Sequence, residues 1–232
     1  MPMTLLSRAE AKAALRRMRR EPKPLSRPVV VAGGIHDPGF VAPHVARVLG
    51  SAITGSDSII SVAFVGPGAR TLDACRDRLI DAVQKTFGPT DGDVTAEVDV
   101  VGYSMGGIVA RHAARQRTEG RRLGIRRLFT ISTPHRGARL AALPTLDQRK
   151  IDMRPGSDFL AALDADLAAA NYEVYSYARV GDLVVGTENT APTGRNPWWV
   201  VGGPLVLSHL GAGHDPRILA DIARRLRGEP PF

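Results

Sequence analysis

The sequence predicts an α/β fold in which one mostly parallel sheet of about six strands has helices on both faces. Six short apolar segments are typical of strands, and most of them alternate with amphipathic helical segments. Strands that are apolar throughout are typical of parallel sheets buried on both faces. The chain has 232 residues, of which 44% are hydrophobic, and this suits one domain with a sizeable core.

The elements follow in order along the chain. Ser7 and Glu10 have the spacing of a capping box, which predicts a helix running to about Arg20, and a proline-broken linker follows it. The segments expected to form strands are 28–34, 58–66, 95–103, 126–132, 172–180 and, less regularly, 198–207. Helices are expected near 38–50, 70–87, 105–118 and 216–227. We therefore divide the chain into a basic helical segment with its linker, 1–27, and an α/β domain, 28–232.

The longest departure from the alternation lies between the fourth and fifth expected strands. We expect residues 136–171 to form a short lid insertion over one end of the sheet, with a helix that starts at Ser157. No internal repeat and no second domain is apparent in the sequence.

The formal net charge of +8 is unevenly distributed. Residues 1–30 hold eight Lys and Arg against two Glu, and residues 111–127 hold seven Arg against one Glu. Such clusters can attract anionic membranes or nucleic acid, but a charge run is most often a solvated helix face. No RNA-binding signature accompanies the charge, and aromatic residues make up only 5% of the chain. We therefore expect no nucleic-acid partner.

One short segment carries the strongest functional signal. In Gly102-Tyr103-Ser104-Met105-Gly106, a serine lies between two glycines, after a strand-like segment and before a helix-like one. This placement forces the serine into a sharp turn, and the glycines let the strand and the helix pass close together. The turn presents Ser104 at the carboxyl edge of the sheet with a helix N-terminus behind it, and both features favour a developing oxyanion. The motif predicts Ser104 as a nucleophile.

A nucleophilic serine needs a base, and the base needs an acid that orients it. In a sheet of this type the acid and then the histidine follow the serine along the chain, which leaves His209 and His214 of the six histidines. Asp182, just after the fifth expected strand, is the preferred acid, and Glu188 is the alternative. His209 is the preferred base because it directly follows the last expected strand, whereas His214 lies at the start of the last helix.

Several segments together resemble small lipases and esterases of the α/β-hydrolase fold, including triacylglycerol-lipase-like proteins and deacylases of GPI-anchor inositol. The matching segments are VVVAGG, VDVVGYSMGGIVAR, LFTISTPHRGA, MRPGSDFL, GDLVV and SHLGAGHDPRIL. In the last of them a histidine precedes Asp-Pro-Arg by six residues, as in the family, and this again selects His209. The resemblance implies that Ser104 is the nucleophile, Asp182 the orienting acid and His209 the general base and acid.

The resemblance also implies an oxyanion hole made of two backbone N–H groups. One belongs to Met105, and the other comes from the loop after the first strand of the sheet. The relatives usually carry His-Gly in this loop, whereas this chain has Gly33-Gly34 followed by Ile35. We expect the Ile35 N–H to be the second donor.

The function implied is hydrolysis of carboxylic esters, by a lipase or carboxylesterase, through an acyl-serine intermediate and without a cofactor. A thioesterase or acyltransferase would use the same three residues, and a non-catalytic scaffold that binds lipid is the alternative from another class. Because the insertion is shorter than a large lipase lid, we expect a partly open site for short to medium acyl chains. His36 and Asp37 could pair on a metal, but two ligands make a poor site, so no metal is expected.

The expected substrate is a small-molecule or lipid ester, with weak contact to an anionic membrane surface at most and no obligate protein partner. The single cysteine, Cys75, excludes an intramolecular disulfide, and no apolar stretch approaches the roughly 20 residues of a membrane span. The first residues also lack the apolar core of a signal peptide, and these features together predict a cytoplasmic location. Deletion of residues 1–20 is expected to leave kcat/KM on a soluble short-chain ester almost unchanged.

Overall fold

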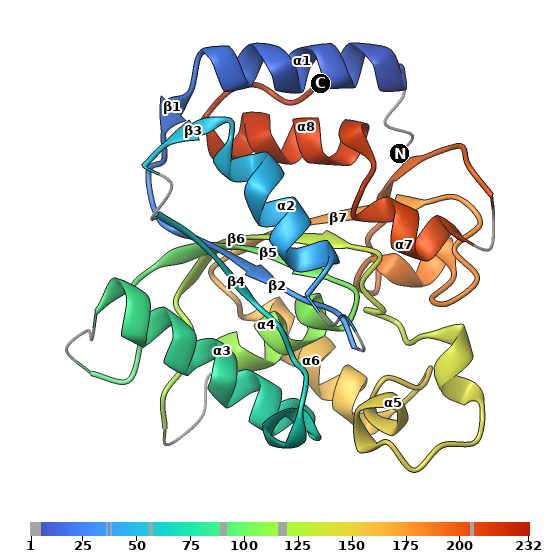
Figure 1. The fold of residues 1–232 in the computed structure, drawn as a ribbon. Helices are drawn as coiled ribbons and strands as arrows, with labels where there is room; N and C mark the ends of the chain where they lie inside the picture. Colours follow the sequence, from blue (N-terminus) through green and yellow to red (C-terminus); the bar gives the residue numbers. More distant parts are fainter. Residues whose placement is uncertain are drawn as a thin grey trace.

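The computed structural model describes residues 6–35, 37, 39–55, 58–88, 92–115, 120–204 and 207–232. Its centre is a six-stranded sheet in the order β4-β2-β5-β6-β7-β8, in which every neighbouring pair is parallel (Figure 1). The strands are β2 (Val29–Ala32), β4 (Ile59–Val62), β5 (Val98–Tyr103), β6 (Ile125–Ile131), β7 (Glu173–Arg179) and β8 (Trp198–Val200). The predicted parallel α/β architecture is confirmed.

Helices cover both faces of this sheet. One face carries α2 (Val41–Gly50) and α8 (Pro216–Leu226), and the other carries α3 (Leu72–Phe87), α4 (Met105–Ala114) and α6 (Asp158–Ala168) (Figure 1). Successive side chains of β2 point to opposite faces of the sheet. Val29 and Val31 pack on the side of α2 and α8, whereas Val30 packs on the side of α3 and α4. None of the helices that the structure describes has the length and apolar character needed to cross a bilayer.

The last expected strand is shorter than predicted, and this changes the position of His209. The strand β8 ends at Val200 rather than continuing to residue 207. Gly202 and Gly203 follow with positive φ angles of 121° and 87°, and Pro204 has no N–H to donate to a strand ladder. The prediction that His209 directly follows the strand is therefore wrong, because His209 lies on a short separate helix, α7 (Ser208–Ala212).

The sequence also did not predict several short elements. They are the parallel pair β1 (Lys23–Pro24) and β3 (Ile53–Thr54), the helix α5 (Gln148–Asp152), and the 3-10 turns η2 (Pro67–Ala69), η3 (Arg139–Ala142) and η4 (Thr187–Thr190). The helix expected at 105–118 is α4, which ends at Ala114, and residues 116–118 of the expected range lie outside the described residues.

The segment between β6 and β7 has two parts. Its second part is α6, which begins as predicted after Ser157, whose Oγ accepts the N–H of Leu160 at 3.3 Å. Leu160 and Leu163 are buried in the core on the α4 side, so α6 covers the sheet. The first part, η3 and the residues up to α5, lies beyond the carboxyl end of β6.

The N-terminal helix α1 (Arg8–Arg20) forms a further layer outside α8 (Figure 1). The predicted capping box is present, because Ser7 Oγ accepts the Glu10 N–H at 3.2 Å and the Glu10 carboxylate accepts the Ser7 N–H at 2.7 Å. The inner face of α1 buries Ala11, Ala14 and Met18, whereas its basic residues are exposed. The basic face of the helix is therefore solvated, as expected, and its opposite face packs on the domain.

This packing leads to a stability prediction. Met18→Ala is expected to lower the free energy of unfolding by about 2–3 kcal/mol, because it removes a buried side chain between α1 and the rest of the domain. Arg16→Ala, on the exposed face of the same helix, should change it by less than about 0.5 kcal/mol. Urea denaturation of both variants measures the difference, and equal effects would show that the inner face of α1 does not contribute to stability.

Candidate active site

Ser104 lies in a sharp turn between β5 and α4. Its backbone has a φ of 52° and a ψ of −124°, a conformation that costs a residue with a side chain about 1–3 kcal/mol. The glycines around it allow the turn, because a Cβ on Gly102 would overlap the backbone of Gly107 and a Cβ on Gly106 would overlap the carbonyl of Ala32. α4 therefore lies very close to β2 and β5, and it begins at the residue after Ser104.

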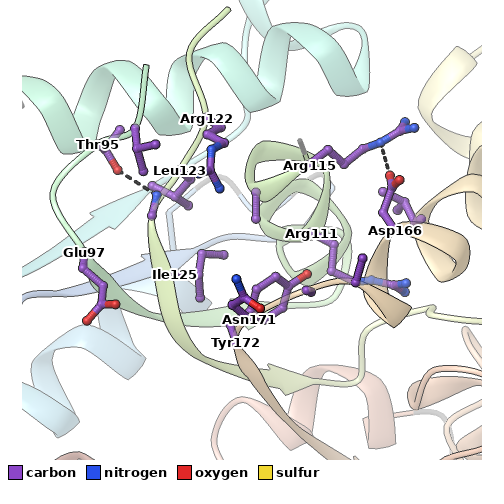
Figure 2. Close-up of a pocket in the computed structure, with 16 residues that line it drawn as sticks. Thr95, Glu97, Arg111, Arg115, Arg122, Leu123, Ile125, Asp166, Asn171 and Tyr172 are labelled. Atoms are coloured by element: carbon purple, nitrogen blue, oxygen red, sulfur yellow. Dashed lines mark hydrogen bonds and ion pairs between the residues drawn. The ribbon is translucent and has the colours of Figure 1, made fainter. Parts of the chain in front are cut away.

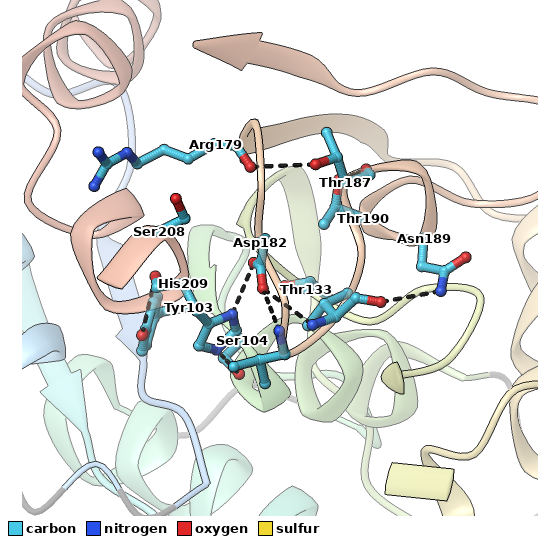
Figure 3. Close-up of polar contacts among 12 residues, drawn as sticks. Tyr103, Ser104, Thr133, Arg179, Asp182, Thr187, Asn189, Thr190, Ser208 and His209 are labelled. Atoms are coloured by element: carbon cyan, nitrogen blue, oxygen red, sulfur yellow. Dashed lines mark hydrogen bonds and ion pairs between the residues drawn. The ribbon is translucent and has the colours of Figure 1, made fainter. Parts of the chain in front are cut away.

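Three side chains predicted from the sequence form one continuous chain of hydrogen bonds (Figure 3). His209 Nε2 lies 3.0 Å from Ser104 Oγ, and His209 Nδ1 lies 2.8 Å from Asp182 Oδ2. Because an ionised carboxylate can only accept, Nδ1 donates to Asp182, and Nε2 is left to accept the hydrogen bond of the Ser104 hydroxyl. The three residues follow β5, β7 and β8, so the structure brings them together at the carboxyl edge of the sheet.

Asp182 is almost completely buried but well supplied with donors. Its Oδ1 accepts the backbone N–H groups of Val184 and Val185, both at 3.0 Å, while Oδ2 faces His209. Burial disfavours the charged form, but the hydrogen bonds from His209 and the Val185 N–H favour it more, so the pKa of Asp182 lies below its ordinary value. The carboxylate is therefore ionised at neutral pH and can stabilise a positive charge on the His209 ring.

The helix α7, which carries His209, is fixed to its neighbours. Ser208 Oγ donates to the carbonyl of Val180 at 3.2 Å, which ties α7 to the end of β7. Tyr103 places its ring 5.6 Å from the His209 ring, and its hydroxyl lies 3.4 Å from the His209 carbonyl oxygen. The sequence analysis did not single out Tyr103 or Ser208. Each directly precedes a predicted site residue, Ser104 or His209, and this is the one signal in the sequence that could have indicated a role in the site.

The alternative acid and base lie elsewhere. Glu188 forms an ion pair with Arg139, and more than half of its side chain is exposed. His214 is exposed, and its ring lies against that of His44 with 4.2 Å between the centroids. The contacts of the described residues join neither side chain to Ser104, so the geometry favours Asp182 and His209 over both.

The residues expected to supply the oxyanion donors belong to the two segments next to Ser104. Met105 is the first residue of α4, so its N–H has no partner within the helix and lies at the positive end of the helix dipole. Ile35 lies in the loop after β2 and lines the same cavity as Ser104. A Cβ on Gly34 would lie 3.2 Å from the Ser104 Cβ, so this loop passes directly beside the serine.

Asp37, which the sequence suggested only as half of a metal pair, fixes the loop that carries Ile35. Its Oδ1 accepts the N–H of Phe40 at 2.8 Å, and its Oδ2 accepts the N–H of Ala42 at 3.1 Å. The carboxylate therefore anchors the loop to the start of α2. His36 lies outside the described residues, and among the residues that are described there is no group of three or more His, Cys, Asp or Glu side chains able to hold a metal ion.

A cavity of about 340 Å³ opens beside Ser104 and His209. Most of its lining is apolar, with Asp37 and His214 as further polar members; the apolar residues include Ile35, Phe40, Val41, Val184 and Leu210. An apolar cavity with a few convergent polar groups is typical of a binding site for a small molecule. The arrangement combines a polarised hydroxyl with an apolar space next to it.

A second cavity, of about 350 Å³, lies near the amino ends of β5, β6 and β7, away from Ser104 (Figure 2). Arg111, Arg115 and Arg122 line it together with Tyr172. Arg111 is paired with Asp164 at 2.7 Å, and Arg115 is paired with Asp166. Much of the basic cluster at 111–127 is therefore neutralised within the domain, which lowers its attraction for external anions.

The parallel sheet and the strained serine between β5 and α4 define the protein as one with the α/β-hydrolase fold. Within this class, residues 69–148 match the family model described as the PGAP1-like alpha/beta domain. The matched range covers about a third of the chain and includes Ser104, but neither Asp182 nor His209. The predicted resemblance to α/β-hydrolase lipases and esterases is confirmed.

Solved structures show the same fold. The phospholipase PlaB from Legionella pneumophila, in complex with thio-NAD, matches with a TM-score of 0.58 and 14% identity over 87% of this chain. The match covers 58% of the PlaB chain, so the present chain corresponds to only part of that protein. A Lactobacillus plantarum WCFS1 protein described as a candidate cell surface hydrolase matches with a TM-score of 0.50 and 15% identity, over 88% of this chain and 92% of that one. No curated protein sequence matches the chain.

Proposed function

We propose that the protein is a serine hydrolase that cleaves carboxylic esters, of the lipase or carboxylesterase type, through an acyl-serine intermediate. The observation that carries the proposal is the continuous hydrogen-bonded chain from Ser104 through His209 to Asp182. Each member has the chemistry its position requires, because a hydroxyl faces a neutral imidazole nitrogen and a buried carboxylate faces the other nitrogen.

The proposed reaction has two halves. His209 Nε2 takes the proton of the Ser104 hydroxyl as Oγ attacks the ester carbonyl carbon, and it then gives this proton to the leaving alkoxide. In the second half, His209 takes a proton from water, and the resulting hydroxide attacks the acyl-serine. The acid leaves, and Ser104 regains its proton. Asp182 holds the imidazole in the required tautomer and stabilises the imidazolium form in both halves.

The negative oxygen of each tetrahedral intermediate requires donors that are already in place. We assign this role to the N–H groups of Met105 and Ile35, which belong to the two segments next to Ser104. The start of α4 adds the favourable end of its dipole. The Asp37 carboxylate helps to hold the second donor by anchoring its loop to α2.

The apolar lining of the cavity supports a substrate ester with an apolar acyl or alcohol part. The residues proposed to act in the reaction need no cofactor. We propose that the site accepts short to medium acyl chains, because the cavity is open and only about 340 Å³ in volume. The single cysteine, Cys75, is buried and calls for no oxidising compartment, and we propose the cytoplasm as the location.

Two measurements test the proposal. A fluorophosphonate probe should label the protein at Ser104, and p-nitrophenyl esters graded from acetate to dodecanoate should be hydrolysed with a preference for the shorter members. Faster turnover of matched thioesters, or transfer to an added alcohol, would favour the thioesterase or acyltransferase alternative. Absence of both labelling and hydrolysis would favour a non-catalytic lipid-binding scaffold.

The identity of the acid gives a sharper prediction. Asp182→Asn keeps the size of the side chain but can no longer stabilise the imidazolium, so kcat should fall by about 10⁴-fold with little change in KM. Glu188→Gln is the matched control, and its effect should stay within about threefold because Glu188 pairs with Arg139. Steady-state kinetics on p-nitrophenyl butyrate measures both, and a reversed ranking would assign the acid to Glu188.

A further inference from the structure

The second cavity of the structure takes no part in the proposed reaction. It lies near the amino ends of β5, β6 and β7, and its volume of about 350 Å³ is close to that of the cavity beside Ser104 (Figure 2). Binding sites for small molecules commonly have volumes of about 300–1,000 Å³. α4 begins after Ser104 at the carboxyl edge of the sheet, and its last residue, Ala114, lines this second cavity. We name it the amino-end cavity.

The charged side chains that line the amino-end cavity are paired, with one exception. The ion pairs of the lining residues are Arg111 with Asp164, Arg115 with Asp166 and Glu97 with Arg27. Arg122 also lines the cavity, and in the part of the chain that the structure describes it forms no ion pair with a carboxylate. The cavity therefore contains one unmatched positive charge.

The backbone of Arg122 is fixed at the wall of the cavity. Its N–H donates to the Asp93 carbonyl at 2.7 Å, and its carbonyl accepts the Thr95 N–H at 3.0 Å. Among the described contacts, Asp93 meets Arg122 through this backbone bond only. Arg122 is partly buried, so solvent screens its charge less than that of a fully exposed arginine. Figure 2 shows Arg122 apart from the pair of Arg115 and Asp166.

The end of α4 presents little opposition to an anion in this cavity. The last carbonyl groups of a helix form the negative end of its dipole, and they repel an anion when they are free. Two of them already accept hydrogen bonds within the chain. The Ala113 carbonyl accepts the Leu123 N–H at 2.7 Å, and the His112 carbonyl accepts the Arg115 N–H at 3.4 Å. These bonds lower the negative potential next to Arg122.

Much of the remaining lining is apolar. Leu123, Ile125 and Leu163 line the cavity and belong to the core on the α4 side, so part of its wall is the hydrophobic core itself. The partly buried ring of Tyr172 lines the cavity next to them. An apolar group placed against these side chains would be removed from water, which is favourable. The amino-end cavity thus combines one free cation with an apolar wall.

We infer that the amino-end cavity binds a small monocarboxylate with an apolar body, its carboxylate on Arg122 and its body against Leu123 and Ile125. A guanidinium suits a carboxylate because two parallel N–H groups meet two oxygens. One unmatched positive charge favours a singly charged carboxylate over a phosphate monoester, which carries nearly two charges at neutral pH. The site goes beyond the proposed ester hydrolysis and does not depend on it, although carboxylates of this class are also the acid products of that reaction.

Isothermal titration calorimetry of the full chain with octanoate and with octanol tests the inference. Octanoate should bind about tenfold more tightly or better, because only the carboxylate can bond the Arg122 guanidinium. Arg122→Gln should remove this preference, and Arg122→Lys, which keeps the charge but not the paired N–H groups, should retain part of it. Arg126→Gln is the matched control, because Arg126 is exposed and does not line the cavity, and it should leave both affinities unchanged. Ala170→Phe, on the partly buried wall, should fill the cavity and weaken octanoate binding by about tenfold or more.

Three results would overturn the inference. Octanoate and octanol could bind equally well, which would leave no role for Arg122. The preference for octanoate could survive in Arg122→Gln that circular dichroism shows to be folded, which would place the acid elsewhere in the molecule. In the third, octyl phosphate would bind more tightly than octanoate and would lose this advantage in Arg122→Gln, which would assign the site to phosphate monoesters. Loss of octanoate binding with intact ester hydrolysis rejects the ligand site alone, whereas octanoate binding by a chain without esterase activity rejects only the proposed function.

Discussion

Ser104→Ala should reduce ester hydrolysis by about 10⁴-fold or more and should abolish labelling by a fluorophosphonate. The expected loss is this large because no other described side chain is joined to His209 as a hydroxyl nucleophile, and removal of a triad nucleophile disables the whole group. The substitution removes one oxygen atom and its hydrogen bond with His209 Nε2, so the fold should be retained. Circular dichroism and urea denaturation check that point alongside the kinetics.

A second serine variant shows whether the loss of activity is specific to Ser104 or follows the loss of any serine. Ser26→Ala, on the exposed linker, should leave labelling and kcat/KM unchanged. Ser104→Gly should be as inactive as Ser104→Ala but more stable by about 1 kcal/mol, because glycine adopts the φ of 52° without strain. Substantial activity in the folded alanine variant would reject the proposed mechanism.

His209→Ala should lower kcat by about 10³-fold or more with little change in KM. The imidazole is the group that moves the proton in both halves of the proposed reaction, and its Nε2 is the nitrogen that faces Ser104. His214→Ala is the matched control, because His214 follows α7 and lines the same cavity but contacts His44 rather than Ser104. Its effect should stay below about tenfold. A larger effect at His214 than at His209 would move the base and leave Ser104 and Asp182 in place.

Much of this site could be predicted because its serine, acid and histidine are expected in a fixed order along the chain. The glycines around Ser104 are a local signal, since only glycine fits where α4 crosses β5 and β2. The order of the chain left His209 and His214 as candidate bases, and Asp182 was preferred over Glu188 because a parallel sheet collects the ends of its strands at one edge. The sequence did not show the contacts across the sheet, such as the Tyr103 hydroxyl with the His209 carbonyl oxygen, because these depend on how segments far apart in sequence meet.

One error has a local physical cause. The segment 198–207 reads as apolar and strand-like, but positive φ angles at Gly202 and Gly203 end the strand and place His209 on a helix of its own. The N-terminal helix was expected to have a solvated basic face, and its basic residues are exposed, but the sequence analysis did not name Ala11, Ala14 and Met18 as its buried positions. Their spacing of three and four residues was the signal that could have indicated packing.

The close approach of α4 to the sheet has a consequence for how this sequence can drift over evolutionary time. Gly102 and Gly106 are required by backbone crowding and Gly107 by the side chain of Thr133, and this crowding remains when Ser104 is no longer a serine. Under the proposed function, a descendant that lost ester hydrolysis but kept its fold would therefore retain the glycines and be free to change Ser104, Asp182 and His209. Under the same proposal, the glycines mark the ability to fold, whereas Ser104, Asp182 and His209 would separate active homologues from inactive ones. A mutational scan selected for folding alone should find the glycine positions intolerant and Ser104 permissive.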